Sequence, residues 1–498
     1  MVLGEVLEGT GAALDAAAAS LEIAGITHDS GRVRPAYAFF AFPGRKADGH
    51  NFAAEAERRG AAVCICERHI EGLSVLQIVL PNARRALAFA AANFYGNPQR
   101  RMRICGVTGT NGKTSTAYML KTVFSHGGYK TALLGTAKGS IGDIAYTPPL
   151  EDTEASEYET MTTPDPEVLY RTLADLAARG VEVTVMEASS HALALDKLAP
   201  IEFELGIFTN LSHEHLDFHG TMENYLAAKA KLFDRCRVGL FNTDDAAARA
   251  LMQRAKCRTV GYGLTPPSDY LAEEIESYGV RGSTYLLHTR NARFRIKTQI
   301  PGSFTLYNTL AAAAAARECG VDLVCIQNSL YALRGIAGRL EKVNLGFMGG
   351  AFTVFIDYAH TPFALENLLL CVREFRGAGQ RIVTLLGCGG ERDREKRPVM
   401  GKIAVENSDY VIFTSDNPRT EEPQAILRDI LGGVGSADNY IVIENRREAI
   451  EYAVANALAG DIILLVGKGH EQYEIDKDGL HPFSETEIVQ EAAERYRS

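Results

Sequence analysis

The segment at residues 103–115 limits the possible folds of this chain more than any other. Residues 104–107 are apolar or small, which is typical of a buried parallel strand. Glycines at positions 109 and 112 allow the backbone to approach an anion closely. A helix expected over residues 114–126 would direct its first amide groups to the same place. The segment therefore predicts a strand, an anion-binding loop and a helix.

The side chains of this loop indicate which anion it binds. Lys113 can reach phosphate oxygens, and the Thr114 hydroxyl can ligate Mg²⁺. Val107 stands where the strict P-loop pattern has glycine, so the loop is a variant. The alternative is an ordinary glycine-rich turn, which the closing Gly-Lys-Thr makes less favourable. The residues expected to bind nucleotide are Gly109, Thr110, Asn111, Gly112, Lys113, Thr114 and Ser115.

The length of 498 residues predicts two to four domains rather than one core. The rhythm of strands and helices places α/β domains at residues 1–101, 102–336 and 337–498. The net charge of −10 disfavours a nucleic-acid partner. Nine scattered cysteines indicate buried free thiols in a reducing cytosol. No apolar run is long enough to cross a membrane, so we expect a cytoplasmic protein without membrane insertion.

Hydrophobic periodicity places the secondary structure. In the first domain we expect strands at 36–42 and 61–66 and helices at 51–59 and 83–93. In the second we expect strands at 130–135, 181–188, 205–209, 238–242 and 258–262, a loop at 141–160, a hairpin at 283–299 and a helix at 308–319. In the third we expect strands at 353–356, 381–386, 410–414, 440–443 and 461–466.

Polar loops follow four of the five strands expected in the third domain. They lie at residues 357–360, 387–393, 415–421 and 467–471. The carboxyl ends of parallel strands share one edge of a sheet, where ligands bind. The four loops are therefore expected to converge on one site. In the first domain, the turns at 29–32 and 44–49 have no such support, and they are either a nucleotide-binding surface or solvated turns.

Two further segments carry candidate metal-binding residues. Glu187 ends an apolar strand, so it is either the carboxylate partner of Mg²⁺ beside the P-loop or a surface turn residue. His213, His215 and His219 follow the next strand, but the cysteines or the His-Glu-x-x-His of a zinc site are missing. One of these histidines is expected to serve a Mg²⁺ ion or a phosphate, and the others to be structural or exposed.

Lys229 falls on the apolar stripe of a helix predicted at residues 225–233. Burying an unpaired ammonium is costly. The side chain therefore either extends to solvent or lines a site. In a site its pKa would fall, and the amine could react with CO₂ to form a carbamate, an anionic metal ligand.

Seven motifs in this order resemble the Mur ligases, which are ATP-dependent amide ligases of peptidoglycan synthesis. They lie at residues 109–114, 187–191, 209–217, 228–233, 338–341, 357–362 and 467–471. The resemblance implies three domains: a small N-terminal α/β domain that binds UDP, a central P-loop parallel-sheet ATPase domain, and a C-terminal Rossmann-like domain that binds the incoming amino acid. Within the family, the motifs are most similar to those of the ligases that add the third peptide residue.

The resemblance also implies roles for individual residues. The catalytic set is Lys113, Glu187, His215 and Lys229, and the metal ligands are Thr114, Glu187, His215 and the carbamate of Lys229. Asn308 is expected near adenine, Arg339 near the phosphates and Asp357 near the ribose. Ser30, Thr162, Thr163, Ser189 and Lys197 are expected to hold the UDP-muramoyl-peptide. Arg392, Asp416, Asn417, Arg419, Gly467 and Glu471 are expected to hold the amino acid.

Arg419 indicates which amino acid is added. In this family an arginine at that position is typical of members that add diaminopimelate, whose distal carboxylate a guanidinium can bind with paired hydrogen bonds. Lysine lacks that carboxylate. The implied cofactors are ATP and Mg²⁺, and the implied substrates are UDP-N-acetylmuramoyl-L-Ala-D-Glu and meso-diaminopimelate, with the protein expected to be a monomer. The sequence departs from the family pattern at Gly31, Leu195, Lys197, Thr305 and Phe363.

Four alternatives remain open at this stage. The first is the same reaction with L-lysine or another acceptor. The second is a ligase of the folylpolyglutamate synthase kind, against which the loops at 416–419 and 467–471 argue. The third is a P-loop kinase or NTPase, whose ATP turnover would not need an amine acceptor. The fourth is an inactive binding protein, which is difficult to reconcile with the presence of Lys113, Glu187 and Lys229.

Overall fold

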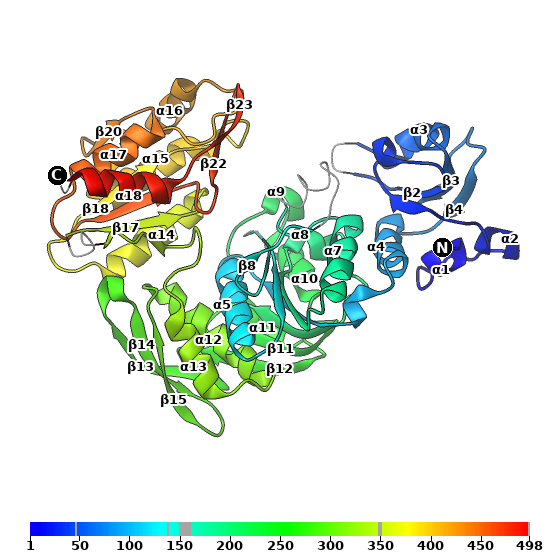
Figure 1. Cartoon of the computed structure of the whole chain (residues 1–498), viewed down its shortest axis with the longest axis horizontal. Helices are drawn as coiled ribbons and strands as arrows, with labels where there is room; N and C mark the ends of the chain where they lie inside the picture. Colours follow the sequence, from blue (N-terminus) through cyan, green and yellow to red (C-terminus); the bar gives the residue numbers. More distant parts are fainter. Residues whose placement is uncertain (45–46, 137–138, 149–160, 347–350, 497–498) are drawn as a thin grey trace. The chain divides into compact units, whose positions relative to one another are not determined.

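The structure is a computed structural model that describes residues 1–44, 47–136, 139–148, 161–346 and 351–496 (Figure 1). The described chain forms two compact units. The first comprises residues 1–271, 288–292 and 310–326, and the second comprises residues 272–287, 293–309 and 327–498. Among the described residues, no helix is both long and apolar enough to cross a membrane.

The N-terminal part of the first unit is a parallel four-stranded sheet in the order β1-β2-β3-β4. Its elements are α1 (Leu3–Val6), α2 (Ala16–Ala19), β1 (Gly25–Thr27), β2 (Tyr37–Ala41), α3 (Ala53–Arg58), β3 (Ala61–Cys66), β4 (Leu76–Val79) and α4 (Ala83–Phe94). The predicted strands and helices of this domain are confirmed. Strands β1 and β4 were not predicted, because three or four residues are too few to establish an alternating pattern.

The central sheet of the first unit contains six parallel strands in the order β12-β11-β10-β5-β9-β6. They are β5 (Arg103–Thr108), β6 (Thr131–Leu134), β9 (Val183–Glu187), β10 (Phe203–Phe208), β11 (Cys236–Asn242) and β12 (Arg258–Gly263). The helices between them are α5 (Lys113–His126), α7 (Pro166–Ala178), α8 (Ser190–Ala194), α9 (Leu216–His219), α10 (Met222–Ala230) and α11 (Ala246–Met252). All five strands predicted after the P-loop are confirmed.

The register of this sheet sets the functional loops side by side. Val107 on β5 is paired with Glu187 on β9, and Thr108 is paired with Phe208 on β10. The P-loop, Glu187 and the segment after Phe208 therefore leave the sheet at the same edge. This is the edge where ligands bind in open parallel sheets.

The prediction of a loop at residues 141–160 is wrong for the first of these residues. Strands β7 (Ser140–Ile141) and β8 (Ile144–Ala145) form an antiparallel hairpin, and β7 pairs with the edge strand β6. Main-chain hydrogen bonds along an open sheet edge hold these short strands, and such bonds require no side-chain pattern. The rest of the predicted loop, residues 149–160, lies outside the described residues.

The chain next forms strands β13 (Tyr270–Ser277), β14 (Ser283–His288) and β15 (Arg293–Thr298) and helices α12 (Ser303–Glu318) and α13 (Leu323–Ala332). Strands β14 and β15 are neighbours in the sheet, as the predicted hairpin requires. Helix α12 begins five residues earlier than predicted. Its alanines at 311–316 are fully buried, so their small size serves close packing.

The sheet of the third domain has the order β16-β17-β21-β18-β19-β20. Its strands are β16 (Glu341–Lys342), β17 (Thr353–Asp357), β18 (Ile382–Leu386), β19 (Tyr410–Phe413), β20 (Tyr440–Val442) and β21 (Ile462–Val466). Only β16 is antiparallel to its neighbour. The five predicted strands are confirmed. Asp357, Leu386 and Val466 share one register level, so the polar loops after their strands do leave one edge of the sheet.

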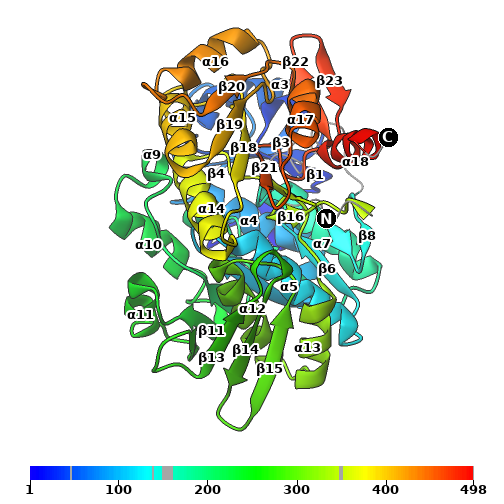
Figure 2. The same ribbon diagram turned by 90° about the vertical axis from the view of Figure 1, so that its left-hand side faces the viewer.

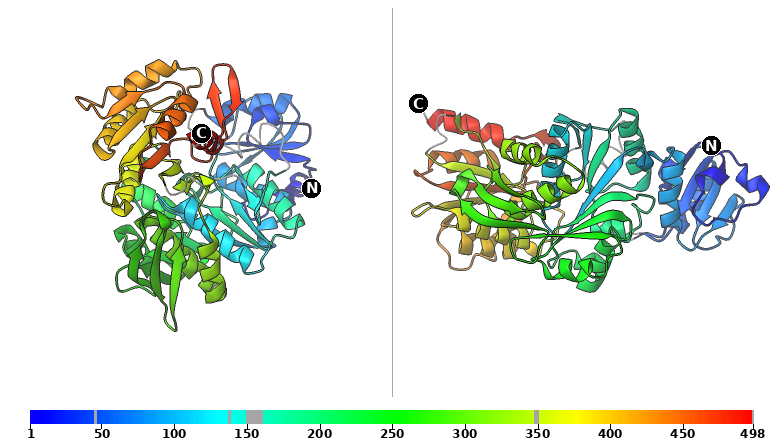
Figure 3. Two further views of the ribbon diagram at one scale, coloured as in Figure 1. Left: turned by 60° about the vertical axis from the view of Figure 1, so that its left-hand side comes forward. Right: turned by 90° about the horizontal axis from the view of Figure 1, so that it is seen from below.

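Helices cover both faces of this sheet (Figure 2). One apolar core contains buried residues of α14 (Pro362–Phe375), α15 (Lys396–Asn407) and α16 (Pro423–Leu431). The other contains buried residues of α17 (Arg446–Ala455) and α18 (Glu485–Tyr496). A separate antiparallel hairpin, which was not predicted, consists of β22 (Tyr473–Asp476) and β23 (Gly479–Pro482). It is coloured orange-red in Figure 3. The α/β fold class with parallel sheets is confirmed.

Candidate active site

The loop after β5 is shaped to receive an anion. Gly109 and Gly112 have φ angles of 144° and 80°, which favour glycine. A Cβ atom at Gly109 would also collide with the Thr209 hydroxyl. Asn210 supports the loop because its Oδ1 atom accepts a hydrogen bond of 3.0 Å from the Asn111 amide. The Lys113 ammonium donates to the carbonyls of Gly109, at 3.2 Å, and Thr110, at 2.8 Å, so it lies over the loop.

Glu187 is buried beside this loop, with 1% of its surface exposed, so the surface-turn alternative is wrong. Its Oε1 atom accepts hydrogen bonds from the Thr114 hydroxyl at 3.0 Å and from the Thr136 amide at 2.8 Å. Glycine is needed at position 135, because a Cβ atom there would collide with the Glu187 carboxylate. A hydroxyl and a buried carboxylate in contact are oxygen ligands of the kind that Mg²⁺ prefers, so these two residues fit the metal.

Lys229 does not extend to solvent: its side chain is 1% exposed, and its Nζ atom donates a 2.7 Å hydrogen bond to the Gly109 carbonyl. The ring of Tyr225 lies 4.3 Å from the same nitrogen. Burial and the neighbouring charge of Lys113 hold the pKa of Lys229 well below its ordinary value. The structure therefore brings a lysine with a lowered pKa against the phosphate-binding loop, which favours the site alternative.

The three histidines have different surroundings. Partial desolvation and the charges of Lys113 and Lys229 lower the pKa of His215 to about 4, although its side chain is 42% exposed, so its imidazole is neutral at pH 7 and fit to ligate a metal. His219 is buried and hydrogen-bonded to the Ser190 hydroxyl at 3.0 Å, and His213 is exposed. The described residues hold no group of three His, Cys, Asp or Glu side chains suited to a metal ion.

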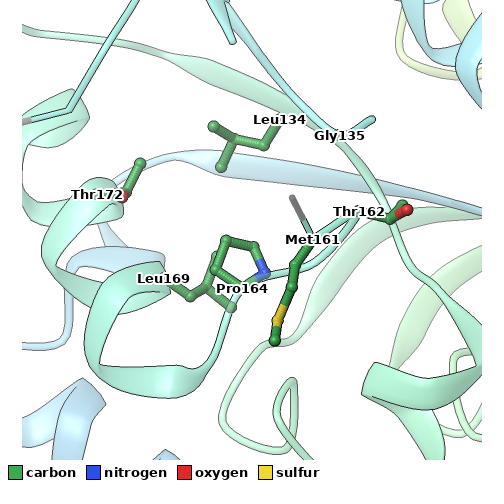
Figure 4. Close-up of a pocket in the computed structure, with 7 residues that line it drawn as sticks. All are labelled: Leu134, Gly135, Met161, Thr162, Pro164, Leu169 and Thr172. Atoms are coloured by element: carbon green, nitrogen blue, oxygen red, sulfur yellow. The ribbon is translucent and has the colours of Figure 1, made fainter. Parts of the chain in front are cut away.

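Four of the five residues predicted to hold the muramoyl-peptide lie on the segments around Glu187. The Thr163 hydroxyl donates a 2.9 Å hydrogen bond to the Glu187 carbonyl and accepts one of 3.3 Å from the Ser189 amide. Lys197 is 2.5 Å from Asp165 in an ion pair. Thr162 lies in a small pocket that is drawn in Figure 4. The other residues that line this pocket are Leu134, Gly135, Met161, Pro164, Leu169 and Thr172.

Ser30 lies elsewhere, in a cavity of about 320 Å³ in the N-terminal sheet domain. The two turns that the sequence analysis left open both line this cavity, through Ser30 and Gly49 among others. The ring of Phe42 forms part of the wall, and the Arg84 guanidinium lies 4.1 Å above the ring. No local pattern predicts the contact of Phe42 with Arg84, because the two residues are 42 positions apart.

The third domain brings together the six residues predicted to hold the amino acid, with Arg392, Arg419 and Asn417 all beside Gly389. The Asn417 amide donates to the Glu471 carboxylate at 2.7 Å, and the Arg419 guanidinium donates to the Gly390 carbonyl at 2.7 Å. A Cβ atom at Gly467 would lie 2.8 Å from the Asp416 carboxylate, so glycine is required there. Arg392 is exposed on the loop after β18.

The residues predicted near the nucleotide in the second unit have different surroundings. The Asp357 carboxylate accepts hydrogen bonds from the amides of Leu340, at 2.7 Å, and Ala359, at 2.9 Å. The Arg339 guanidinium lies 5.0 Å from the ring of Tyr358. Asn308 is buried on α12. The sequence analysis did not single out Tyr358, although it stands within the polar loop that follows β17.

Comparisons with known proteins identify the class to which this fold and site belong. Three family models match: the Mur ligase family catalytic domain over residues 22–95, the Mur ligase middle domain over 107–316, and the Mur ligase glutamate ligase domain over 338–469. The chain belongs to the Mur ligase family, and it is an ATP-dependent ligase with that family's three-domain fold.

Three individual proteins are similar over nearly the whole chain. Two are named UDP-N-acetylmuramoyl-L-alanyl-D-glutamate–2,6-diaminopimelate ligase. The one from Clostridium tetani is 39% identical over 95% of both chains, and the one from Syntrophomonas wolfei is 40% identical over 94% of both. A solved structure with the same name is 31% identical, covers 100% of this chain and 99% of its own, and has a TM-score of 0.70.

Proposed function

We propose that this protein joins meso-diaminopimelate to UDP-N-acetylmuramoyl-L-Ala-D-Glu and converts ATP to ADP and phosphate. The observation that carries the proposal is that a cation, Arg419, lies close enough to an anion, Glu471, for their charges to interact, while Asn417 is hydrogen-bonded to Glu471. Such a pair suits an acceptor that carries both a carboxylate and an ammonium at its far end. The names of the relatives support the same acceptor.

The roles of the three domains follow from the sites that each contains. We assign residues 1–101 to the UDP end of the substrate, because aromatic rings line the cavity beside Ser30 and a guanidinium stacks on one of them. Residues 102–336 provide the ATP phosphate site around Lys113. Residues 337–498 provide the amino-acid site around Arg419.

The reaction begins at the side-chain carboxylate of D-glutamate, whose oxygen attacks the γ-phosphorus of ATP as the bond to ADP breaks. The product is an acyl phosphate. The amine of diaminopimelate then attacks the acyl carbon, an amide bond forms, and phosphate leaves. Lys113 and the backbone amides of the P-loop offset the negative charge that develops on the transferred phosphoryl group.

The residues around Glu187 fit a magnesium ion, which would neutralise charge between the two reacting anions. Thr114, Glu187, His215 and the carbamate of Lys229 are the side chains that would hold magnesium, with the carbamate on a second ion. The carbamate forms when the neutral amine of Lys229 bonds to the carbon of CO₂ and releases a proton to solvent. The lowered pKa of Lys229 supports this step, because only the neutral amine is nucleophilic.

Replacing Lys229 with arginine is expected to reduce ligation at least about 100-fold, the order lost with one electrostatic group of an active site. Arginine keeps a positive charge but stays protonated, so it cannot form the carbamate. Isotopically labelled bicarbonate is expected to give a carbamate NMR signal in the wild type and none in Lys229→Arg. Lys231→Arg is the matched control, because Lys231 is partly exposed and pairs with Asp196. Full activity in Lys229→Arg would contradict the assignment.

The ligation assay itself tests the proposed function. Purified protein is mixed with ATP, Mg²⁺, UDP-N-acetylmuramoyl-L-Ala-D-Glu and meso-diaminopimelate. We expect amide product and ADP in equal amounts. ADP release that does not depend on an amine would instead indicate a kinase or plain NTPase, and product formed only when a folate supplies the carboxylate and glutamate the amine would indicate the folylpolyglutamate synthase alternative.

A further inference from the structure

Lys468 is a buried lysine that takes no part in the proposed ligation reaction. It follows β21, and its side chain has no exposed surface. Its ammonium donates hydrogen bonds to Asn417 Oδ1 at 2.8 Å and to the Tyr473 carbonyl at 3.0 Å, and it lies 3.5 Å from the Asp416 carboxylate. A buried ammonium is costly unless it is fully paired. The cost of burying this charge beside the amino-acid loops indicates that Lys468 has a role there.

The Asn417 side chain links Lys468 to Glu471. Its Oδ1 atom accepts from the Lys468 ammonium and from the Ile475 amide at 3.0 Å, and its Nδ2 atom donates to Glu471 Oε2 at 2.7 Å. If the amide were reversed, its NH₂ group would face two donors. The two donors therefore fix the orientation in which Asn417 offers a hydrogen to the Glu471 carboxylate.

The same contacts fix the loop that carries Arg419. The amide of Arg419 donates a 3.0 Å hydrogen bond to the Ile475 carbonyl, so the loop is bonded to strand β22. Arg419 itself has a φ angle of 53°, an uncommon conformation for a residue with a side chain. Such a conformation persists when surrounding contacts determine it. Lys468 supplies contacts on both sides, because it bonds Asn417 in the loop and Tyr473 in β22.

We propose that Lys468 is a positioning residue for amino-acid selection: through Asn417 it holds Glu471 and Arg419 where the ammonium and the carboxylate of a diamino acid bind. The proposal rests on the proposed function for the identity of that amino acid. Lys468 does not touch the substrate itself, because its side chain is enclosed by Asp416, Asn417 and the β22 segment.

The charges around Glu471 give this role a measurable signature. Burial and the nearby Asp416 carboxylate raise the pKa of Glu471, whereas the Asn417 hydrogen bond and the charges of Lys468 and Arg419 oppose that rise. Burial raises the pKa of Tyr358, and the charge of Glu471 raises it further. Removing the Lys468 charge should raise the pKa of Glu471 further. Because Glu471 must be ionised to hold an ammonium, binding would then be lost at a higher pH as the solution is acidified.

The test is Lys468→Met, which keeps the length of the side chain and removes its charge and donors. We expect KM for diaminopimelate to rise at least about tenfold, as for loss of an outer partner of a binding group. We also expect the acid limb of kcat/KM for diaminopimelate to move to higher pH, with the Kd for ATP unchanged. Lys477→Met is the matched control, because Lys477 is exposed on the turn of the same hairpin.

A second variant and an NMR titration complete the test of Lys468. If Lys468→Met does not fold, Asn417→Asp replaces it: its carboxylate still accepts from Lys468 but cannot donate to Glu471, so the same changes are expected. If the wild type does not ligate diaminopimelate, the proposed function fails, while NMR titration of labelled Glu471 still tests the role of Lys468. A folded variant with the wild-type KM, acid limb and Glu471 pKa would overturn the inference, as would a fall in kcat alone.

Discussion

Replacing Lys113 with alanine is expected to abolish measurable ligation, with a loss of at least about 10³-fold in kcat. The Lys113 ammonium lies over the carbonyls of Gly109 and Thr110, in the loop that we propose receives phosphate. One preorganised group that stabilises transition-state charge is worth about 10² to 10³ in rate, and phosphoryl transfer depends almost entirely on such groups. The side chain is only partly buried, so the variant should fold normally.

The measurement is the rate of amide formation and ADP release, together with a thermal melt of each protein. Lys256→Ala is the control, because Lys256 is exposed and belongs to no predicted site. We expect the two variants to melt at the wild-type temperature and to differ only in rate. A folded Lys113→Ala protein with the wild-type rate would rule out the loop at 109–115 as the ATP site.

Replacing Arg419 with alanine is expected to lower kcat/KM for diaminopimelate about 100-fold and to change it little for L-lysine. The distal carboxylate of diaminopimelate would lose hydrogen bonds to a guanidinium, which are worth about 1.5–3 kcal/mol each. Each 1.4 kcal/mol is about tenfold in affinity. Arg419→Lys should recover little, because an ammonium lacks the planar fork of a guanidinium.

The control for Arg419→Ala and Arg419→Lys is Arg428→Ala, because Arg428 is an exposed arginine on α16. The readout is the ratio of kcat/KM for the two acceptors in each protein. If that ratio is the same in Arg419→Ala and in the wild type, then Arg419 does not select the acceptor and the assignment of this loop is wrong.

Strands buried on both faces were the most predictable part of this fold. Strand β21 is an unbroken run of apolar residues, β18 is interrupted only by Thr384, and all ten of their residues are buried. Such runs are typical of parallel sheets. The short hairpins β7–β8 and β22–β23 were not predicted, because backbone pairing holds them and their side chains are largely exposed or half-buried.

Candidate site residues were predictable where a motif keeps them close in sequence, as in the P-loop. Candidate site residues that lie far apart in the sequence were harder to predict. The sequence placed Lys229 on an apolar stripe, but only its three-dimensional contact with Gly109, 120 positions away, decides between solvent and site. The contact of Lys468 with Asn417 spans 51 positions, and no local pattern predicts it.

The central claim is that this ligase selects diaminopimelate, and a comparison of two acceptors tests it most directly. The wild-type protein is given ATP, Mg²⁺ and UDP-N-acetylmuramoyl-L-Ala-D-Glu, and kcat/KM is measured with meso-diaminopimelate and with L-lysine. We predict a preference for diaminopimelate of about 100-fold or more, the value of one charged hydrogen-bonded contact. Equal values for the two acceptors, or a preference for lysine, would contradict the account.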